Sequence, residues 1–392
     1  MHPLVPLALL LAGPAAGGPP GGEMRGLWVV RTGLVSPEDV DRVVDDAAAA
    51  GFNTLFVQVR GRGDAFYVSS LAPRSPILWK TKADFDPLAR LLDRARGHGL
   101  QVHAWVNVLL TAHFGQPLPP GHVAERHPEW LMVPRSAARA ALRARGSRLF
   151  RLVGQAARAE SGTEGYYLSP SAPGVGEHLE AVVRELLRGY AVQGIHLDFA
   201  RYPGPEFDYS RIALESFRAR QGGGDPLSLP ARFPVAWDDH RREVLTGLVT
   251  RLSRAAQAQR PGLVVSAAVV PDEAQAWGQK YQAWPAWVTS GLLEAVCPMA
   301  YTPDNQIFRA QLEQARSRVG ATQQVWAGIG AYRLPLQGVI EKIHLARETG
   351  VAGVVLFSHE SFAPADLQRL RAEAFPARLA PGDLAVGAAG AR

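Results

Sequence analysis

The sequence predicts a (β/α)₈ barrel, because eight short segments rich in β-branched and aromatic residues alternate with longer helical segments. The short segments are nearly continuous apolar runs, as expected for parallel strands that are covered on both faces. The length of 392 residues and the 47% share of hydrophobic residues suit one large packed domain. A doubly wound open sheet would alternate in the same way, but residues 31–35 (RTGLV) lack its glycine-rich phosphate loop.

Each predicted strand is a short apolar run, and several predicted helices carry end signals. Ser36 is a suitable N-cap for the first helix, Asp84 or Asp86 lies near the start of the second, and Gly99 lies at its end. The predicted strands cover residues 26–31, 53–59, 101–108, 194–199, 263–270, 295–301, 324–329 and 353–358. The predicted helices cover residues 37–50, 84–99, 176–190, 209–220, 238–259, 280–290, 306–317, 336–349 and 364–374.

The alternation pauses after the third strand, where residues 111–173 form a long predicted insertion. This insertion contains seven arginines and no acidic residue between Arg135 and Arg158, which accounts for much of the net charge of +6. The arginines are Arg135, Arg139, Arg143, Arg145, Arg148, Arg151 and Arg158. Aromatic residues do not interleave with them and no nucleic-acid motif is present, so we expect a solvated basic loop and no nucleic-acid partner. Attraction to an anionic cell envelope is the function that this segment suits.

The two ends of the chain differ in composition from the predicted barrel, residues 24–375. Residues 1–22 resemble a secretory signal with cleavage near Ala15 or Ala16, although the alternative of an apolar leader kept in the cytoplasm stays open. Residues 376–392 are rich in Ala, Gly and Pro, and we expect a flexible tail. No later apolar run approaches the roughly 20 residues that span a bilayer. We therefore expect an exported periplasmic or extracellular protein without an integral membrane segment.

In (β/α)₈ barrels the active site lies at the C-terminal ends of the strands, and here those ends carry charged, amide and aromatic residues. The candidates are Arg60, Asp64, Trp105, Asn107, Asp198, Arg201, Tyr202, Asp272, Met299, Tyr301 and Glu360. A buried charge at a strand end costs several kcal/mol unless it is paired or used. Asp198 is therefore either a reactive group or the partner of Arg201 or Arg60 in a structural ion pair.

Aromatic residues near the strands suit carbohydrate, because the C–H faces of pyranose rings stack on Trp and Tyr side chains. Such residues are Trp28, Trp105, Tyr202, Tyr301, Trp277, Trp284 and Trp287. Many of these side chains will pack in the core, and we expect one or two to line a sugar subsite.

The order of seven short segments resembles that of the glycosyl-hydrolase-like family 10 over residues 24–375. The segments are MRGLWV, FVQVRGRGDAFY, HAWVN, HPEWLM, YYLSPSAPGV, GIHLDFARYP and CPMAY. The resemblance implies a (β/α)₈ barrel of the bacterial envelope, some relatives of which hydrolyse the glycan strands of peptidoglycan.

Two segments, GIHLDFARYP and PMAY, are also distantly similar to strand motifs of chitinase-like glycoside hydrolases. This likeness implies that Asp198 matches the carboxylate that positions the N-acetyl group of the substrate. The general-acid glutamate of those enzymes would fall near Ala200 or Arg201, and neither residue is an acid. Their complete mechanism therefore does not transfer to this chain.

Our leading hypothesis is a glycoside hydrolase that acts on an N-acetylhexosamine-containing polysaccharide, namely peptidoglycan glycan strands. Glycoside hydrolysis ordinarily needs two carboxyl groups. Asp198 is the first, as nucleophile, base or acetamido-positioning group. Glu360 is favoured as the second because it directly follows a predicted strand, with Asp272 and Asp64 as alternatives. Asn107, Arg60 and Tyr301 are expected to orient the sugar.

Two other functions stay open. A non-catalytic barrel that only binds glycan would explain the missing acid near Arg201. A metal-dependent deacetylase or hydrolase would use His103, Asp198 and His359, but no closely spaced motif such as H-E-x-x-H occurs. Cys297 is the only cysteine, so a disulfide within the chain and a cysteine-based zinc site are both excluded. We expect no metal and no cofactor.

Overall fold

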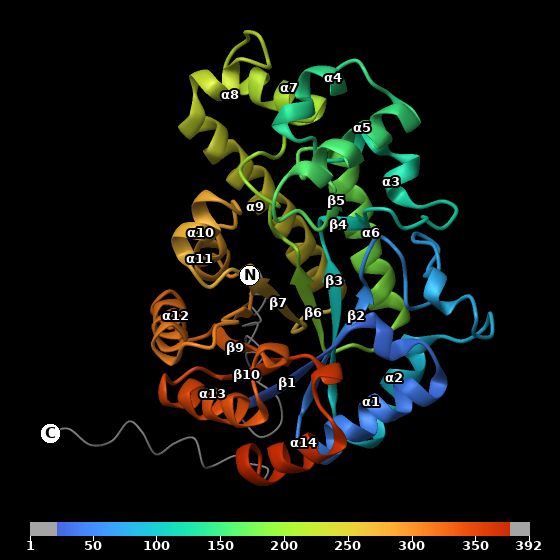
Figure 1. Ribbon diagram of the computed structural model, residues 1–392, viewed down its shortest axis with the longest axis vertical. Helices are drawn as coiled ribbons and strands as arrows, with labels where there is room; N and C mark the ends of the chain where they lie inside the picture. Colours follow the sequence, from blue (N-terminus) through green and yellow to red (C-terminus); the bar gives the residue numbers. More distant parts are fainter. Residues whose placement is uncertain (1–21, 377–392) are drawn as a thin grey trace, which may run out of the picture.

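A computed structural model describes residues 22–376 and confirms the predicted fold class. Eight parallel strands close into a barrel in the order β1, β10, β9, β8, β7, β6, β3, β2 (Figure 1). They are β1 (Met24–Val29), β2 (Thr54–Arg60), β3 (Gln101–Asn107), β6 (Gly194–Asp198), β7 (Val264–Val269), β8 (Ala295–Pro298), β9 (Gln324–Gly330) and β10 (Gly353–Phe357). The predicted leader and tail lie, apart from residues 22 and 376, outside the described residues and stay predictions.

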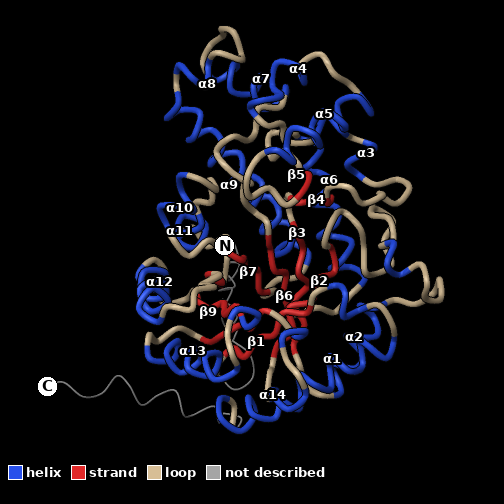
Figure 2. Tube along the Cα trace, in the orientation of Figure 1, coloured by secondary structure: helices blue, strands red, loops and turns tan. Residues whose placement is uncertain are grey.

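Helices surround the barrel in the predicted order (Figure 2). They are α1 (Pro37–Ala50), α2 (Pro87–Gly97), α6 (Pro173–Gly189), α9 (Pro234–Gln259), α10 (Glu273–Gly278), α11 (Trp284–Thr289), α12 (Asn305–Ser317), α13 (Leu336–Glu348) and α14 (Pro364–Arg369). Ser36 caps α1 as predicted, since its side chain accepts the Asp39 backbone N–H. The helix predicted near 280–290 is present as α11, whereas the short α10 before it was not predicted.

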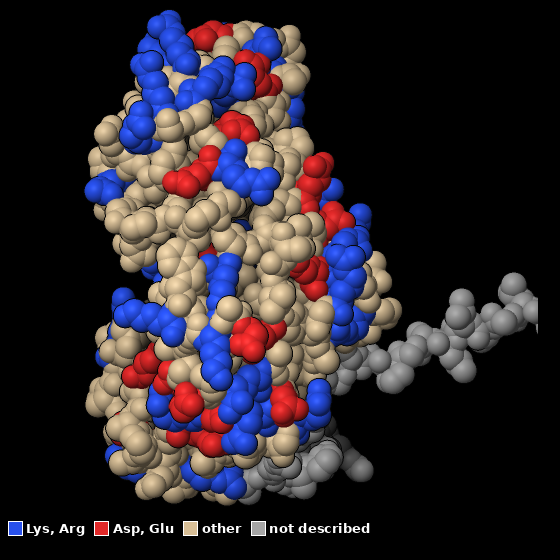
Figure 3. Space-filling model, turned by 90° about the vertical axis from the view of Figure 1, so that its right-hand side faces the viewer, with Lys and Arg blue, Asp and Glu red and all other residues tan. Residues whose placement is uncertain are grey.

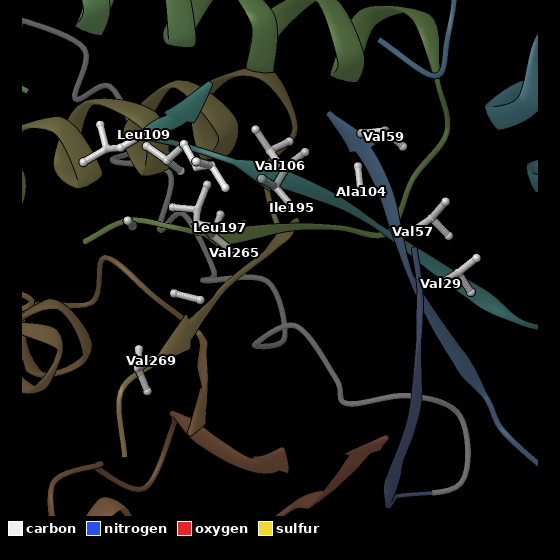
Figure 4. Packing of buried hydrophobic residues seen from close by; sticks show 14 of the residues in the cluster. Val29, Val57, Val59, Ala104, Val106, Leu109, Ile195, Leu197, Val265 and Val269 are labelled. Atoms are coloured by element: carbon white, nitrogen blue, oxygen red, sulfur yellow. The ribbon is translucent and has the colours of Figure 1, made fainter. Parts of the chain in front are cut away.

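Successive side chains along each strand alternate between two apolar environments. Outward-facing side chains such as Val57, Val106 and Leu197 belong to the main hydrophobic core and project from successive strands (Figure 4). Inward-facing side chains such as Trp28, Phe56 and Trp105 form a second, mainly aromatic cluster. The barrel interior is therefore a packed core whose polar groups are confined to a few positions.

Two histidines are among the groups inside the barrel. His103 on β3 and His196 on β6 each lie 4.9 Å, between ring centroids, from Phe56. The Nδ1 atom of His196 is hydrogen-bonded to the Ser266 hydroxyl at 2.9 Å, whereas neither ring nitrogen of His103 has a partner. Both imidazoles are thus held in an environment that strongly disfavours a positive charge.

A helical lobe covers the C-terminal ends of several strands (Figure 1). Its first part is the insertion after β3, built from β4 (Leu110–His113), α3 (Val123–Arg126), α4 (Ala138–Ala141), α5 (Gly146–Ala159) and β5 (Gly165–Tyr167), with β4 antiparallel to β5. Its second part follows β6 and contains α7 (Arg211–Arg220) and α8 (Leu229–Arg232). Ala138, Leu214 and Trp237 belong to one hydrophobic cluster that joins the two parts.

The expectation of a basic loop over Arg135–Arg158 was wrong, because most of this segment is helical. The buried side chains of Leu149, Val153 and Ala157 recur at helical spacing and hold α5 against the lobe. All seven arginines remain exposed, as expected. Among the described residues, no helix is long and apolar enough to span a membrane.

The two histidines inside the barrel predict a loss of stability in acid. Burial, and for His103 also the neighbouring His196, lowers the pKa of each from 6.5 to about 3. The unfolded chain therefore binds protons that the folded barrel does not. Because each folded pKa lies below the unfolded value, this stability is complete above pH 6.5 and is lost as the pH falls toward 3. The expected loss is about 1 kcal/mol per pH unit for each histidine.

His103→Asn should reduce the slope of unfolding free energy against pH by about 1 kcal/mol per pH unit. Urea denaturation at several pH values between about 7 and 4 measures this slope. An unchanged slope in a variant that is folded at neutral pH would contradict the assignment of a neutral, buried His103.

Candidate active site

The strand ends beneath the helical lobe bring Asn107 and Asp198 together at the rim of the barrel. These are the last residues of β3 and β6, and they are direct partners in the parallel ladder. His196 faces the barrel interior, so Asp198, two residues later, also lies on the inner face. The Asp198 residue is only 7% exposed. The rim therefore carries a carboxylate that needs compensation for its burial.

That compensation is concentrated on one carboxylate oxygen. Asp198 Oδ1 accepts the Phe199 backbone N–H at 2.6 Å and the Arg201 Nη1 at 2.9 Å. Among residues 22–376, no group donates a hydrogen bond to Oδ2. Of the two partners considered from the sequence, Arg201 forms the ion pair and Arg60 does not. One oxygen is thus fixed and the other remains free to accept a hydrogen bond from a substrate.

An unusual backbone conformation directs Arg201 back toward Asp198. Phe199 has φ of 51°, in the left-handed region that a bulky residue seldom adopts, and this ends β6 at Asp198. The Arg201 guanidinium then stacks on the Phe199 ring, 4.2 Å from its centroid. The Leu109 backbone N–H donates to the Phe199 carbonyl at 3.3 Å and helps to hold this turn. Such a strained position at a rim carboxylate is typical of a functional site.

Asn107 connects β2 and β3 instead of pointing freely into the mouth. Its Nδ2 donates to the Gly61 carbonyl at 2.6 Å, and its Oδ1 accepts from the Trp105 indole N–H at 2.8 Å. The Asn107 carbonyl accepts from Arg60 Nη1 at 2.7 Å. Arg60 is fully buried, and its Nε and Nη2 atoms have no partner. Arg60 and Asn107 therefore shape the rim, and the Arg60 guanidinium is screened from solvent.

An aromatic wall lies across the mouth. Tyr301 and Tyr332 lie 5.8 and 5.9 Å, between ring centroids, from Phe357 at the end of β10. Trp28 and Trp105 lie 5.8 and 6.2 Å from the same ring on its inner side. Tyr332 is 54% exposed, so the wall continues from the core to the surface. Such a wall suits the apolar face of a sugar ring.

Of the remaining substrate-binding candidates, Tyr202 is withdrawn into the core, and Met299 directly follows the end of β8. Tyr202 is fully buried, with its ring centroid 5.1 Å from that of Tyr281. β8 ends at Pro298, three residues before the predicted end of this strand, and half-buried Met299 forms a single bridge to Gly328. Tyr301 therefore stands on the loop after β8.

The three candidates for a second carboxylate lie at different places on the rim. Glu360 follows β10, four strands from β6 in the closed order, and accepts hydrogen bonds from Thr32 and Ser358 at 2.8 Å each. Asp272 is exposed and caps α10 by accepting the Gln275 N–H. Asp64 is buried in the loop after β2. Glu360 thus lies across the barrel from Asp198, and the Asp272 carboxylate is engaged by its own helix.

The structure brings a further carboxylate, Glu164, to the rim from the lobe. The Tyr167 hydroxyl on β5 donates a hydrogen bond to exposed Glu164, and the Tyr167 ring centroid lies 6.2 Å from that of Phe199. Burial alone would lower the pKa of Arg201, but Asp198, Tyr167 and Glu164 outweigh it and raise this pKa. Glu164 therefore shares an electrostatic neighbourhood with the Asp198–Arg201 pair.

Glu164 is not among the candidates drawn from the sequence, because those candidates lie at strand ends alone. Glu164 belongs to the insertion and stands two residues before the YYLSPSAPGV segment. That segment was recognised as part of a resemblance, and the nearby acidic residue is the signal that could have been followed.

The three groups considered for a metal site do not come together. His359 Nε2 is hydrogen-bonded to Asp46 at 2.9 Å, and His103 lies below the rim among barrel aromatics. Within residues 22–376, no group of three or more His, Cys, Asp or Glu side chains is arranged to hold a metal ion.

Sequence comparison relates the chain to proteins named as glycosyl hydrolases. The model of the family described as glycosyl hydrolase-like 10 matches residues 23–343. Glycosyl hydrolase YngK of Bacillus subtilis (strain 168) is 24% identical over 261 residues, which are 61% of this chain and 43% of YngK. Glycosyl hydrolase DigH of Escherichia coli (strain K12) is 25% identical over 330 residues, which span 71% of this chain and 66% of DigH. The chain thus spans less than two thirds of the length of these curated relatives.

Solved structures show the same fold. The glycoside hydrolase domain of PgaB (BpsB) from Bordetella bronchiseptica has a TM-score of 0.68 at 13% identity, covering 90% of this chain and 99% of that domain. The catalytic domain of β-amylase from Paenibacillus polymyxa has a TM-score of 0.58 at 12% identity, covering 89% and 95%. At these identities the likeness establishes the barrel architecture alone.

The position of Asp272 predicts a mainly structural effect of its substitution. Its Oδ1 accepts the Gln275 N–H at 2.7 Å, so Asp272→Ala should lower the free energy of unfolding by about 1 kcal/mol. Asp272→Asn keeps an oxygen that can accept this hydrogen bond and should change stability much less. Urea denaturation of the two variants measures the difference, and equal losses in both would contradict the cap.

Proposed function

The chain belongs to the glycosyl hydrolase-like 10 family, and from this we propose that it is a glycoside hydrolase acting on an N-acetylhexosamine-containing polysaccharide. The observation that carries the proposal is the rim carboxylate of Asp198, with one oxygen held by Arg201 and the other free. The aromatic wall beside it suits a pyranose ring. Peptidoglycan glycan strands are the substrate that we propose within this class.

In the proposed reaction, Asp198 is the ionised carboxylate at the anomeric centre. Arg201 stabilises its negative charge, and the free oxygen either attacks the anomeric carbon or orients the acetamido group of the sugar. The phenol of Tyr301 is a second polar group here. Burial, with Cys297 and Asp198 nearby, raises its pKa well above the usual value. Tyr301 thus stays protonated and can donate a hydrogen bond to the sugar.

We propose Glu164, from the lobe, as the second carboxyl group. It is exposed, and Lys280 and Arg201 lie in its electrostatic neighbourhood. A sugar seated in the mouth would remove solvent from Glu164 and favour the protonated form, as a proton donor to the leaving oxygen requires. Its hydrogen bond from Tyr167 fixes its position relative to Phe199 and Asp198.

Asp198→Asn should lower kcat on the glycan by at least about 100-fold, because the ionised carboxylate is lost. The Asn oxygen can still accept from Phe199 and Arg201, so the melting temperature should stay close to that of the native chain. Asp198→Ala instead unpairs the buried Arg201 and should cost about 3 kcal/mol of stability. Turnover by the Asn variant at the native rate would overturn the assignment of Asp198 as a reactive group.

Glu164→Gln should lower kcat on polymeric glycan by about 100-fold or more, since proton donation to the leaving group is removed. A dinitrophenyl glycoside needs little protonation of its leaving group, so its hydrolysis should fall much less. Glu177→Gln is the matched control, because Glu177 is exposed on α6. Equal losses on both substrates, or no loss, would exclude Glu164 as the proton donor.

A non-catalytic glycan-binding barrel is the second candidate function. The resemblance to chitinase-like enzymes implies an acid near Ala200 or Arg201, and the observation that favours a binding barrel is that Arg201 is instead paired with Asp198. Incubation with denuded glycan strands, followed by mass spectrometry of the products, separates the two functions. Bound but intact glycan would support the binding barrel.

The basic lobe supports a proposal about location. Lys and Arg side chains gather over the top of the molecule in Figure 3, where the lobe lies. Among the described residues, none of the seven arginines from Arg135 to Arg158 forms an ion pair with a carboxylate. We propose that this surface contacts an anionic cell envelope, in keeping with export directed by residues 1–22.

A further inference from the structure

A separate pocket of about 370 Å³ lies beside the barrel mouth. It is enclosed by the loops after β1 and β2 on one side and by the start of the lobe insertion on the other. Its polar lining includes Arg31, Arg62, Asp64, Gln116 and His122. Neither Arg31 nor Arg62 has been assigned a role in the reaction at Asp198.

Neither of the two pocket arginines is paired with a carboxylate. Arg31 Nη1 donates to Gln58 Oε1 at 3.0 Å, and Arg62 Nη1 donates to Gln116 Oε1 at 3.0 Å. In the described part of the chain, no carboxylate oxygen lies within 4.0 Å of either guanidinium. Both guanidinium groups are instead oriented by neutral amides, which leaves their charges uncompensated at short range.

Two glycines beside these arginines leave room for the side chains that line the pocket. A Cβ atom on Gly61 would lie 3.0 Å from Arg31 Cδ and 3.1 Å from Arg31 Nη1, so glycine makes room for this side chain. Gly63 has φ of 73°, and a Cβ there would lie 2.6 Å from His122 Nε2. The Gly-Arg-Gly sequence therefore fits tightly against both walls of the pocket.

The charged residues that line the pocket are two arginines and one aspartate. Burial and the neighbouring Arg31 lower the pKa of Arg62, which places the two guanidinium groups in each other's field. Asp64 is the single carboxylate among the lining residues, and its Oδ1 accepts the Arg62 backbone N–H at 3.0 Å. Glu360 and Glu164, which lie outside the lining, also act on Arg31 and Arg62, so the fit to an anion rests on the two amide-held guanidinium groups and not on a net charge.

His122 adds no charge to this balance. Its Nε2 is hydrogen-bonded to the Arg62 carbonyl at 2.8 Å, and its Nδ1 accepts the Ala124 N–H at 3.2 Å. Burial lowers its pKa, so the ring is neutral and donates from Nε2. Beneath the rim, the buried Arg60 guanidinium has two unpartnered nitrogens and also lies in the field of Asp64. Asp64 is thus shared among three arginines and neutralises none of them by direct contact.

We propose that this pocket is a subsite for a carboxylate-bearing sugar of the glycan. Two guanidinium groups held by amides can receive a carboxylate through charge-assisted hydrogen bonds. The pocket adjoins the reaction centre, since the Gly61 carbonyl accepts from Asn107, the ladder partner of Asp198. This inference rests on the proposed function and adds a substrate preference, namely N-acetylhexosamine chains in which some sugars carry an acidic ether substituent.

The test compares two forms of one denuded glycan, the native form with free carboxylates and a form in which they are reduced to alcohols. The native protein should show a KM about tenfold lower for the carboxylated glycan. Arg31→Gln/Arg62→Gln should bring the ratio of the two KM values close to 1, with the main effect on KM and not on kcat. Arg62→Gln alone should bring the ratio of the two KM values part of the way toward 1. Because Arg62 is half-exposed, this single variant covers the case in which the double variant does not fold.

Arg188→Gln/Arg254→Gln is the charge-matched control, because both residues are exposed on the outer helices α6 and α9. It should keep the native KM ratio. A native protein that cleaves both glycans with equal KM overturns the subsite and leaves the proposed function standing, as does a control that loses the preference equally. A native protein that neither binds nor cleaves either glycan overturns both.

Discussion

The ion pair between Asp198 and Arg201 is the interaction on which the rim of the barrel depends. An ionised carboxylate at the end of a buried strand costs several kcal/mol unless donors compensate it, and the neighbouring strand backbones are already committed to the parallel ladder. Residues directly after Asp198 supply these donors. Phe199 adopts a left-handed conformation, and the Arg201 side chain folds back over the Phe199 ring. Because both donors use Oδ1, the compensation leaves Oδ2 free. The same contact thus offsets the cost of burying the carboxylate and leaves Oδ2 available to a ligand.

The lobe is attached to that same turn. The backbone N–H groups of Val108 and Leu109 donate to the carbonyls of Asp198 and Phe199, and the Leu168 N–H donates in turn to the Leu109 carbonyl. These hydrogen bonds join the end of β6 to the β4–β5 hairpin, so the position of the hairpin follows from that of the rim. Tyr167, next to Leu168, therefore has a fixed place above Phe199. The insertion is an extension of the barrel rim and not a separate appendage.

Most of the barrel could be predicted from the sequence, because buried parallel strands are locally apolar and capping residues mark helix starts. The exceptions have local causes. The fourth predicted strand stops at Asp198 because Phe199 takes a positive φ, which no composition signal encodes. The basic segment was expected to be a loop because its charge dominated, yet Leu149 and Val153 supply the buried face of α5. Reading the strand ends placed Asp198 at the end of β6, where the structure has it, but it placed Tyr301 on a strand that ends at Pro298. It could not show that Asp272 caps a helix or that Arg60 is buried, since both depend on contacts formed only in the folded chain.

Barrel geometry also explains why a second carboxyl group should come from the lobe. Two catalytic carboxyl groups must flank the sugar, at separations of about 5–9.5 Å. Neighbouring strand ends approach the sugar from the same side as Asp198, whereas Glu360 follows a strand four positions away in the closed order and is held by Thr32 and Ser358. In the proposed complex, a residue on the β4–β5 hairpin would approach the sugar from the lobe above the mouth and not from a strand end. The proposed role of Glu164 rests on its bond from Tyr167, because the hairpin is hydrogen-bonded to the turn that carries the Asp198–Arg201 pair.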